Sequence, residues 1–177
     1  MRIITGKFKG RPLYSPKNQD IRPTSDRARE FLFSYLGTNV YEARVLDLFA
    51  GSGALGIEAV SRGAASAVFV DQSKEAVDLI NRNLEKFGLS FPVIRRDAVS
   101  YLQSTLNEKF DLIFCDPPYK YTAFETIAER SRQQVLHPDG VLIYESDRRI
   151  DAPEIKGLEI IKVKKIGNTK MSIYRYV

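Results

Sequence analysis

Four consecutive residues, Asp116-Pro117-Pro118-Tyr119, combine an acidic side chain, two rigid residues and an aromatic ring. Proline fixes the backbone and has no N–H donor, so the Asp116 carboxylate and the Pro117 carbonyl can present two acceptors in a fixed arrangement. An exocyclic amine on a nucleic-acid base carries two N–H groups, and accepting both favours attack by its nitrogen lone pair. Tyr119 offers a face on which a base can stack. The pattern predicts group transfer to a planar amine, with these four as catalytic residues; the alternative is a proline-stiffened surface turn.

A glycine-rich segment at residues 47–56 follows an apolar run and precedes a helical pattern. Glycines here let the chain turn sharply and let a ligand approach the backbone closely. We predict that Asp47, Phe49, Gly51 and Gly53 bind a cofactor. The glycine spacing also fits the dinucleotide fingerprint, so the motif by itself leaves NAD and S-adenosylmethionine open.

Two further acidic residues end predicted strands. Asp71 lies where a carboxylate can accept hydrogen bonds from ribose hydroxyls. Asp97 suits an adenine amine, and the backbone N–H of Ala98 suits a ring nitrogen, although Asp97 could equally be a helix N-cap. Together with Asp47, these make three acidic residues at strand ends. Their negative charge gives little attraction for a pyrophosphate and favours the cationic S-adenosylmethionine as cofactor.

Alternating strands and helices must position these residues. Strands are predicted at 45–50, 67–71, 92–96, 110–115 and 141–145, and helices at 54–62, 74–87, 98–106 and 123–136. Such alternation requires crossovers and a parallel sheet. Residues 158–166 and 171–177 should then pair antiparallel. We therefore predict an α/β, Rossmann-like, doubly wound sheet that is mostly parallel and ends in an antiparallel hairpin, in a single domain with an extension at 1–43 and a core at 44–177.

The extension carries the excess charge. Residues 1–29 hold eight basic and two acidic side chains, whereas the whole chain has a net charge of +5. Residues 2–14 are predicted to form a small β-hairpin, and Ser25 to cap a helix whose apolar stripe contains Ala28, Phe31, Leu32, Tyr35 and Leu36. Clustered positive charge favours a polyanion, although a solubilising tail is the alternative. The residues predicted to contact nucleic acid are Lys7, Lys9, Arg11, Arg27 and Arg29.

Composition narrows the class of protein. One cysteine and one histidine cannot supply a disulfide within the chain or a metal site built from such ligands, so no metal is predicted. We expect Cys115 to be buried in its strand and His137 to lie in a surface turn. No apolar run approaches the roughly 20 residues that span a bilayer, and the start lacks a signal-peptide pattern. These features favour a cytoplasmic protein that contacts no membrane.

Taken together, residues 47–56, Asp71, Asp97 and the 116–119 tetrapeptide resemble the class I amino-methyltransferases. The stretches Arg2-Ile3-Ile4-x-Gly6, Gly10-Arg11 and 22–30 (RPTSDRARE) are similar to the bacterial small-subunit rRNA guanine-N2 methyltransferases of the RsmD type, which modify guanine 966 of 16S rRNA. The resemblance implies that Arg22 and Thr24 close over the methionine end of S-adenosylmethionine. It also implies that 16S rRNA, in a partly assembled small subunit, is the partner, and we expect the protein to be a monomer.

Alternative functions stay open at this point. The target amine could be adenine N6 in a nucleic acid or a protein glutamine. An NAD-dependent dehydrogenase would use the same glycine segment but gives no reason for the 116–119 tetrapeptide. A non-catalytic RNA-binding protein would use the basic extension alone.

Overall fold

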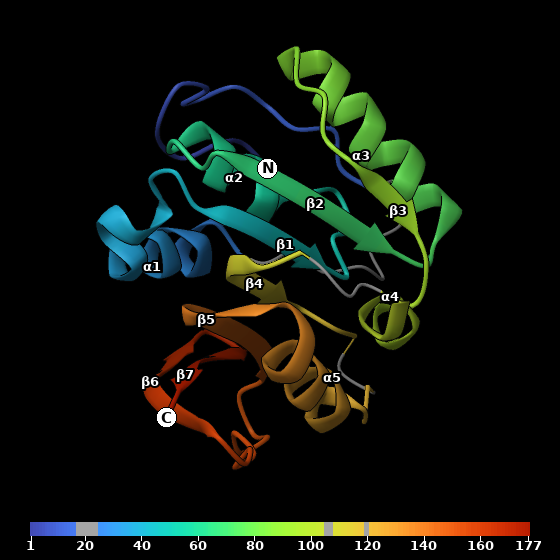
Figure 1. The fold of residues 1–177 in the computed structure, drawn as a ribbon. Coiled ribbons are helices and arrows are strands. Elements are labelled where there is room, and N and C mark those ends of the chain that lie inside the picture. Colours follow the sequence, from blue (N-terminus) through green and yellow to red (C-terminus); the bar gives the residue numbers. More distant parts are fainter. Residues whose placement is uncertain (17–24, 105–107, 119–120) are drawn as a thin grey trace.

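The computed structural model describes residues 1–16, 25–104, 108–118 and 121–177. These residues build one seven-stranded sheet with the strand order β3-β2-β1-β4-β5-β7-β6 (Figure 1). The strands are β1 (Arg44–Leu48), β2 (Ser66–Asp71), β3 (Val93–Arg95), β4 (Phe110–Cys115), β5 (Leu136–Asp147), β6 (Leu158–Ile166) and β7 (Thr169–Tyr176). The helices are α1 (Asp26–Leu36), α2 (Ala54–Ser61), α3 (Lys74–Phe87), α4 (Ala98–Ser104) and α5 (Phe124–Arg130), with a 3-10 turn η1 (Gly37–Val40) and a π turn η2 (Ser131–Val135).

The sheet is parallel from β3 to β5 and antiparallel at one edge. β1 pairs with β2 and β4, and β5 pairs with β4, all in parallel. β7 lies antiparallel between β5 and β6. The strand order reverses between β1 and β4, and ligands of such sheets bind beyond the carboxyl ends of the strands at this point. The predicted α/β architecture, including its antiparallel hairpin, is confirmed.

Helices cover both faces of the sheet (Figure 1). Side chains of α1, α2 and α3 share one apolar cluster with alternate strand residues, among them Leu32, Ile57 and Ile80. Side chains of α4 and α5, such as Leu102 and Ile127, belong to the cluster on the other face. Strands covered on both faces need mostly apolar residues, which is why β1 and β4 are largely apolar, with Asp47 and Asp111 as exceptions. No helix within the described ranges is long and apolar enough to cross a membrane.

The first segment of the chain doubles back without forming two strands. Ile3 N donates to Arg11 O at 3.0 Å and Gly10 N donates to Ile3 O at 2.8 Å, but Arg2 and Pro12 make an isolated bridge rather than a ladder. The two arms of the predicted hairpin do lie side by side, but the prediction that they form β-strands is wrong. Backbone groups of this segment bond to α2 instead, because Lys7 N donates to Ser61 O at 2.7 Å.

Helix α1 begins where the sequence predicts, but it turns a different face inward. Ser25 accepts a hydrogen bond from Ala28 N at 3.2 Å, as an N-cap does. Phe33 is buried, whereas Tyr35 is 40% exposed and Phe31 lies half-buried. The predicted stripe is therefore wrong at its aromatic residues, because Phe33 is buried in place of Phe31 and Tyr35.

The segment before β5 also differs from the prediction. The helix expected over 123–136 ends as α5 at Arg130, passes through the π turn and gives way to β5 at Leu136, which pairs with Phe110. Cys115 is buried, as predicted. The side chain of His137 is at the surface, as predicted, and its Nδ1 accepts from Asp139 N at 3.2 Å. His137 itself lies in strand β5, so the turn predicted there is wrong.

Candidate active site

The loop after β1 turns on residues with positive φ. Phe49, Gly51 and Gly53 have φ values of 57°, 57° and 76°. A Cβ added at Gly51 would meet only Phe49 O at 3.9 Å, so this glycine borders open space. A Cβ at Gly56 would fall 2.3 Å from Phe69 Cε1, so that glycine is needed for packing against β2. The part of the loop that a ligand can approach is therefore its tip at Gly51.

Asp47 supports the loop from inside the protein. Its Oδ2 accepts from Gly56 N at 2.9 Å, and the residue is 1% exposed. Burial raises the pKa of Asp47 well above its ordinary range; the Gly56 N–H opposes this shift, and the charges of Asp116 and Asp71 add to it. The carboxylate is buried against the helix start, and the contact with a cofactor predicted for Asp47 stays a prediction.

Asp71 joins the end of β2 to the glycine loop. Its Oδ2 accepts from Gly51 N at 3.0 Å and its Oδ1 accepts from Ser73 N at 2.9 Å. The residue is half-exposed, and each carboxylate oxygen has a further lone pair. Asp71 can therefore hold the loop and still accept hydrogen bonds from a ligand.

Asp97 acts as the N-terminal cap of α4. Its Oδ1 accepts from Ser100 N at 3.0 Å, and the neighbouring Ala98 is buried. The capping alternative is thus what the structure shows for this oxygen. Asp97 also lies near Tyr121, since burial and then the Asp97 charge raise the pKa of the Tyr121 hydroxyl.

Tyr121 is a site residue that the sequence reasoning missed. Its ring meets the Phe49 ring edge-on, with the centroids 4.9 Å apart. Tyr121 N donates to Pro118 O at 2.8 Å. An aromatic residue two positions beyond the tetrapeptide was the available signal. Tyr121 therefore connects the glycine loop, the cap of α4 and the 116–118 segment.

Asp116 lies at the carboxyl end of β4, next to the glycine loop. Leu48 pairs with Cys115, so the following residues, Phe49 and Asp116, leave adjacent strands at the same rim. The charge of Asp116 contributes, after burial, to raising the pKa values of Asp47 and Cys115, which places its carboxylate close to both. Pro117 is buried, and Pro118 is exposed. Tyr119, Arg22 and Thr24 lie outside the described residues.

The predicted RNA-binding residues differ in their solvent exposure and in their contacts with the rest of the protein. Lys7, Lys9 and Arg27 are exposed. Arg11 is also exposed, but its Nη2 donates to Lys86 O at 2.7 Å and its guanidinium lies 4.5 Å from the Phe87 ring centroid. Arg11 therefore also anchors the first segment to α3.

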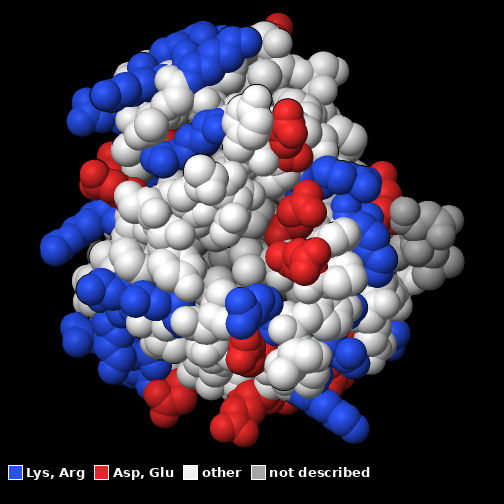
Figure 2. All heavy atoms as spheres, turned by 60° about the vertical axis from the view of Figure 1, so that its left-hand side comes forward, with Lys and Arg blue, Asp and Glu red and all other residues white. Residues whose placement is uncertain are grey.

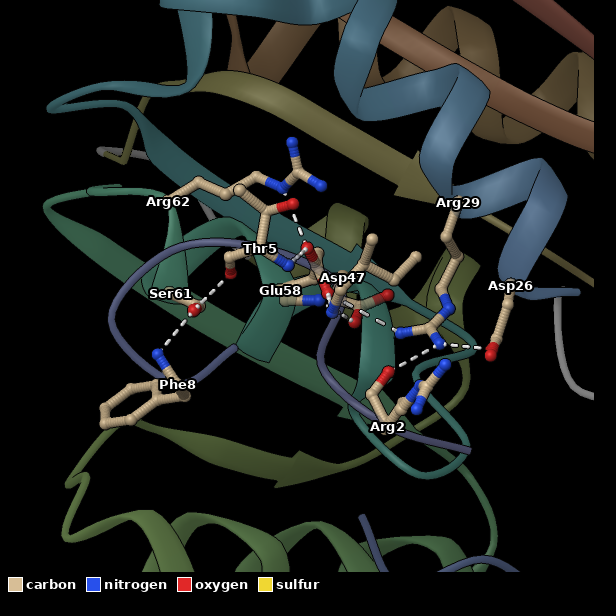
Figure 3. A network of polar contacts seen from close by, with 11 residues as sticks. Arg2, Thr5, Phe8, Asp26, Arg29, Asp47, Glu58, Ser61 and Arg62 are labelled. Carbon is tan, nitrogen blue, oxygen red and sulfur yellow. Dashed lines mark hydrogen bonds and ion pairs between the residues drawn. The ribbon is translucent and has the colours of Figure 1, made fainter. Parts of the chain in front are cut away.

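Arg29 is fully buried, so the prediction that it contacts RNA is wrong. Its Nη1 lies 3.7 Å from Glu58 Oε2, and its Nη2 bonds Asp26 at 2.6 Å and Arg2 O at 2.8 Å (Figure 3). Glu58 is itself fully buried on α2. The sequence placed Arg29 off the apolar stripe, but a buried carboxylate on a neighbouring helix supplies the reason for burying a cation.

In the ranges that the structure describes, no three side chains of His, Cys, Asp or Glu gather as metal ligands. What the rim does offer is an open glycine tip, two acidic residues with ligand-accessible oxygens, and a proline-stiffened acidic residue beside them. The chemistry that this set offers is acceptance of hydrogen bonds from hydroxyl and amine donors at one edge of the sheet.

Comparison with known proteins places this chain in a family. The family model described as Conserved hypothetical protein 95 matches residues 1–175. YlbH of Bacillus subtilis, described as an rRNA methyltransferase, is 37% identical, with 99% of this chain and 98% of that protein covered. Ribosomal RNA small subunit methyltransferase D of Haemophilus influenzae is 31% identical over 99% of this chain and 93% of its own length. The solved structure of yhhF from Escherichia coli has a TM-score of 0.90 and 30% identity, covering 99% of this chain and 97% of that chain.

Proposed function

Because this chain belongs to the Conserved hypothetical protein 95 family, we propose that it transfers a methyl group from S-adenosylmethionine to the exocyclic N2 amine of a guanine in 16S ribosomal RNA. The observation that carries the proposal is the position of Asp116, which leaves β4 directly beside the glycine loop that leaves β1. Relatives named as methyltransferases of small-subunit rRNA support the class of substrate.

The residues at the rim fit S-adenosylmethionine. Gly51 borders open space, so a ligand can reach the loop backbone without meeting a side chain. Asp71 binds backbone N–H groups with both carboxylate oxygens, and Asp97 does so with Oδ1. Each oxygen keeps a further lone pair, which suits ribose hydroxyls at Asp71 and an adenine amine at Asp97. S-adenosylmethionine, when bound, supplies an electrophilic methyl group on a sulfonium.

The chain's own part in the reaction is to hold the amine. Asp116 and the Pro117 carbonyl accept the two N–H groups, which fixes the nitrogen and directs its lone pair away from the protein. Proline at 117 and 118 limits movement of these acceptors, so positioning and preorganised charge provide most of the rate enhancement. Tyr119, which lies outside the described residues, is the residue that we assign to stacking on the guanine. The amine is already neutral, so its proton leaves only after attack, to Asp116 or to water.

Basic residues of the first segment and of α1 bring the RNA to this rim. Lys7, Lys9 and Arg27 have exposed side chains, and each can neutralise a phosphate. The substrate is the rRNA in a partly assembled small subunit, and the protein acts as a monomer in the cytoplasm.

The test is methyl transfer with purified components. Protein, S-adenosylmethionine with a labelled methyl group, and small subunits from cells lacking the enzyme are incubated, and the rRNA is digested to nucleosides. Label should appear in N2-methylguanosine. Asp116→Ala should lower the rate by about 100-fold or more, since loss of a preorganised polar contact has effects of that size.

The matched control is Asp139→Ala, which removes an exposed carboxylate in the turn before the second half of β5. It should keep the full rate, and both variants should keep the thermal midpoint of the wild type within a few degrees. Label in adenosine or in protein would refute the guanine assignment, and an active Asp116→Ala would refute the mechanism.

A further inference from the structure

Helix α1 presents a line of one basic and two aromatic residues outside its buried face. Arg27, Phe31 and Tyr35 are spaced by four residues and so lie on one side of the helix. The rings of Phe31 and Tyr35 are stacked, with centroids 6.3 Å apart and an interplanar angle of 24°. Tyr35 is 40% exposed and Phe31 is half-buried, so ring surface remains in contact with water.

Two lysines of the edge strand β6 lie over these rings. Lys162 Nζ is 5.8 Å from the Tyr35 ring centroid, and Lys164 Nζ is 5.8 Å from that of Phe31. Alternate residues of a strand share a face, so the two lysines project to the same side of the sheet. We call the surface formed by Arg27, Phe31, Tyr35, Lys162 and Lys164 the α1–β6 surface.

Blocking of the sheet edge explains only part of this arrangement. Lysine on an edge strand discourages pairing with another strand, and β6 has such residues on both faces. That role does not require exposed aromatic rings beneath the lysines. Rings that offer a face, flanked by cations, are instead the combination that binds single-stranded nucleic acid by stacking and phosphate contacts.

The α1–β6 surface also leads to the rim where Asp116 lies. β6 ends at Ile166, which pairs with Thr169, and Thr169 pairs with Asp147 at the carboxyl end of β5. Arg148 extends the basic side chains to this end, where its Nη1 donates to Gly167 O at 3.3 Å. Figure 2 turns the α1 side of the molecule forward and shows an uncharged central area bordered by Lys and Arg side chains, with Asp and Glu side chains also beside it, mainly on its right.

We propose that the α1–β6 surface binds a single-stranded segment of the RNA substrate, with a base stacked on Tyr35 and phosphates held by Lys162 and Lys164. This proposal rests on the function proposed above, because it assumes an RNA substrate at the rim. It adds a binding surface on the antiparallel edge of the sheet, whereas the excess charge of the sequence lies in residues 1–29.

The first test removes charge from this surface. Lys162→Gln/Lys164→Gln is compared with Lys156→Gln/Lys165→Gln, which removes the same charge from exposed positions off the α1–β6 surface. Binding of 16S rRNA transcript is measured by filter retention between 0.1 and 1 M salt. The loss of two phosphate contacts lowers the slope of log affinity against log salt concentration by about 1.4. If the variant and the wild type bind equally at 1 M salt, the variant then binds roughly 25-fold more weakly at 0.1 M salt.

The control pair should bind the transcript with the wild-type slope. Equal slopes for the two double variants would overturn the proposal, because the α1–β6 surface would then hold no phosphates. In methylation assays the variant should raise KM and leave kcat unchanged, since these lysines do not touch the reacting amine.

The second test removes the stacking surface. Tyr35→Ala should weaken binding by at least about fivefold, whereas Tyr35→Phe, which keeps the ring, should bind like the wild type. Unchanged binding by Tyr35→Ala would overturn the stacking role. Failure of the proposed function is distinct from these results, because the wild type itself would then transfer no methyl group to rRNA.

Discussion

Glu58 holds the first segment of the chain onto the core, and its removal should have a large effect on stability. Its two oxygens accept from Ile4 N at 2.7 Å and from Thr5 N at 3.0 Å (Figure 3). Arg62 Nε donates to Oε1 at 2.8 Å, and Arg29 Nη1 lies 3.7 Å from Oε2. Glu58→Ala therefore removes acceptors from two backbone groups and leaves Arg29 buried beside fewer negative charges.

The expected loss of unfolding free energy is about 3–5 kcal/mol, the range for breaking a buried ion pair by removing one partner. Glu58→Gln keeps one carbonyl oxygen and should lose less, about 1–3 kcal/mol. With an m-value of about 2 kcal/mol/M in urea, Glu58→Ala should lower the denaturation midpoint by about 2 M.

Urea denaturation followed by circular dichroism measures this loss, and limited trypsin digestion reports the release of the first segment through cleavage at Lys7 and Lys9. Glu85→Ala, an exposed carboxylate on α3, is the control and should change stability by no more than about 0.5 kcal/mol. Glu58→Gln/Arg29→Met should be more stable than the sum of the single effects predicts, because the two side chains are coupled. A loss below about 1 kcal/mol for Glu58→Ala would refute the reasoning.

Three further changes test other parts of the fold. Burial raises the pKa of Asp47, so ionising this group opposes folding and stability should fall as pH rises from the ordinary carboxyl range toward the raised pKa. Asp47→Asn keeps an acceptor for Gly56 N and should remove that slope in urea titrations at several pH values. Burial raises the pKa of Tyr144 from 10.0 to about 12, so its contribution is complete below pH 10 and is lost above it; Tyr144→Phe should flatten alkaline unfolding between pH 10 and 12. Gly56→Ala should destabilise the protein by about 1–3 kcal/mol in calorimetry, because the new Cβ overlaps the buried Phe69 ring.

The sequence predicted the central strands of the sheet well because helices cover them on both faces. Largely apolar runs marked β1 and β4, and the turn residues Gly167-Asn168 marked the antiparallel hairpin. Features that depend only on neighbouring residues were predicted equally well, as the N-cap of α1 at Ser25 shows. The fold could therefore be derived from pattern and spacing.

Long-range polar contacts could not be derived in this way. The buried face of α1 includes Arg29, whose partner Glu58 lies 29 positions further along the chain and is buried beside it. The first segment likewise gives up strand pairing for bonds to α2, such as Phe8 N to Ser61 Oγ at 3.0 Å. Both outcomes require knowledge of which helix packs next to which segment.

In the candidate site, too, some features could be predicted from the sequence and others depend on contacts between distant segments. Asp71 and Asp116 lie at strand ends on the rim, where the spacing of acidic residues and glycines predicted them. Asp47 has the supporting role of a buried acceptor, and Tyr121 joins the site through its contact with Phe49. Sequence spacing indicates which residues reach the rim, but not which face of the loop each side chain occupies.

The central claim is that Asp116 beside the glycine loop directs methyl transfer to a guanine amine of small-subunit rRNA. Mass mapping of 16S rRNA from cells lacking this protein tests it most directly. We predict one unmethylated guanine that is restored to N2-methylguanine by the wild-type gene but not by Asp116→Ala, with both proteins present at equal levels. A fully methylated 16S rRNA in the deletion strain, or restoration by Asp116→Ala, would contradict the claim.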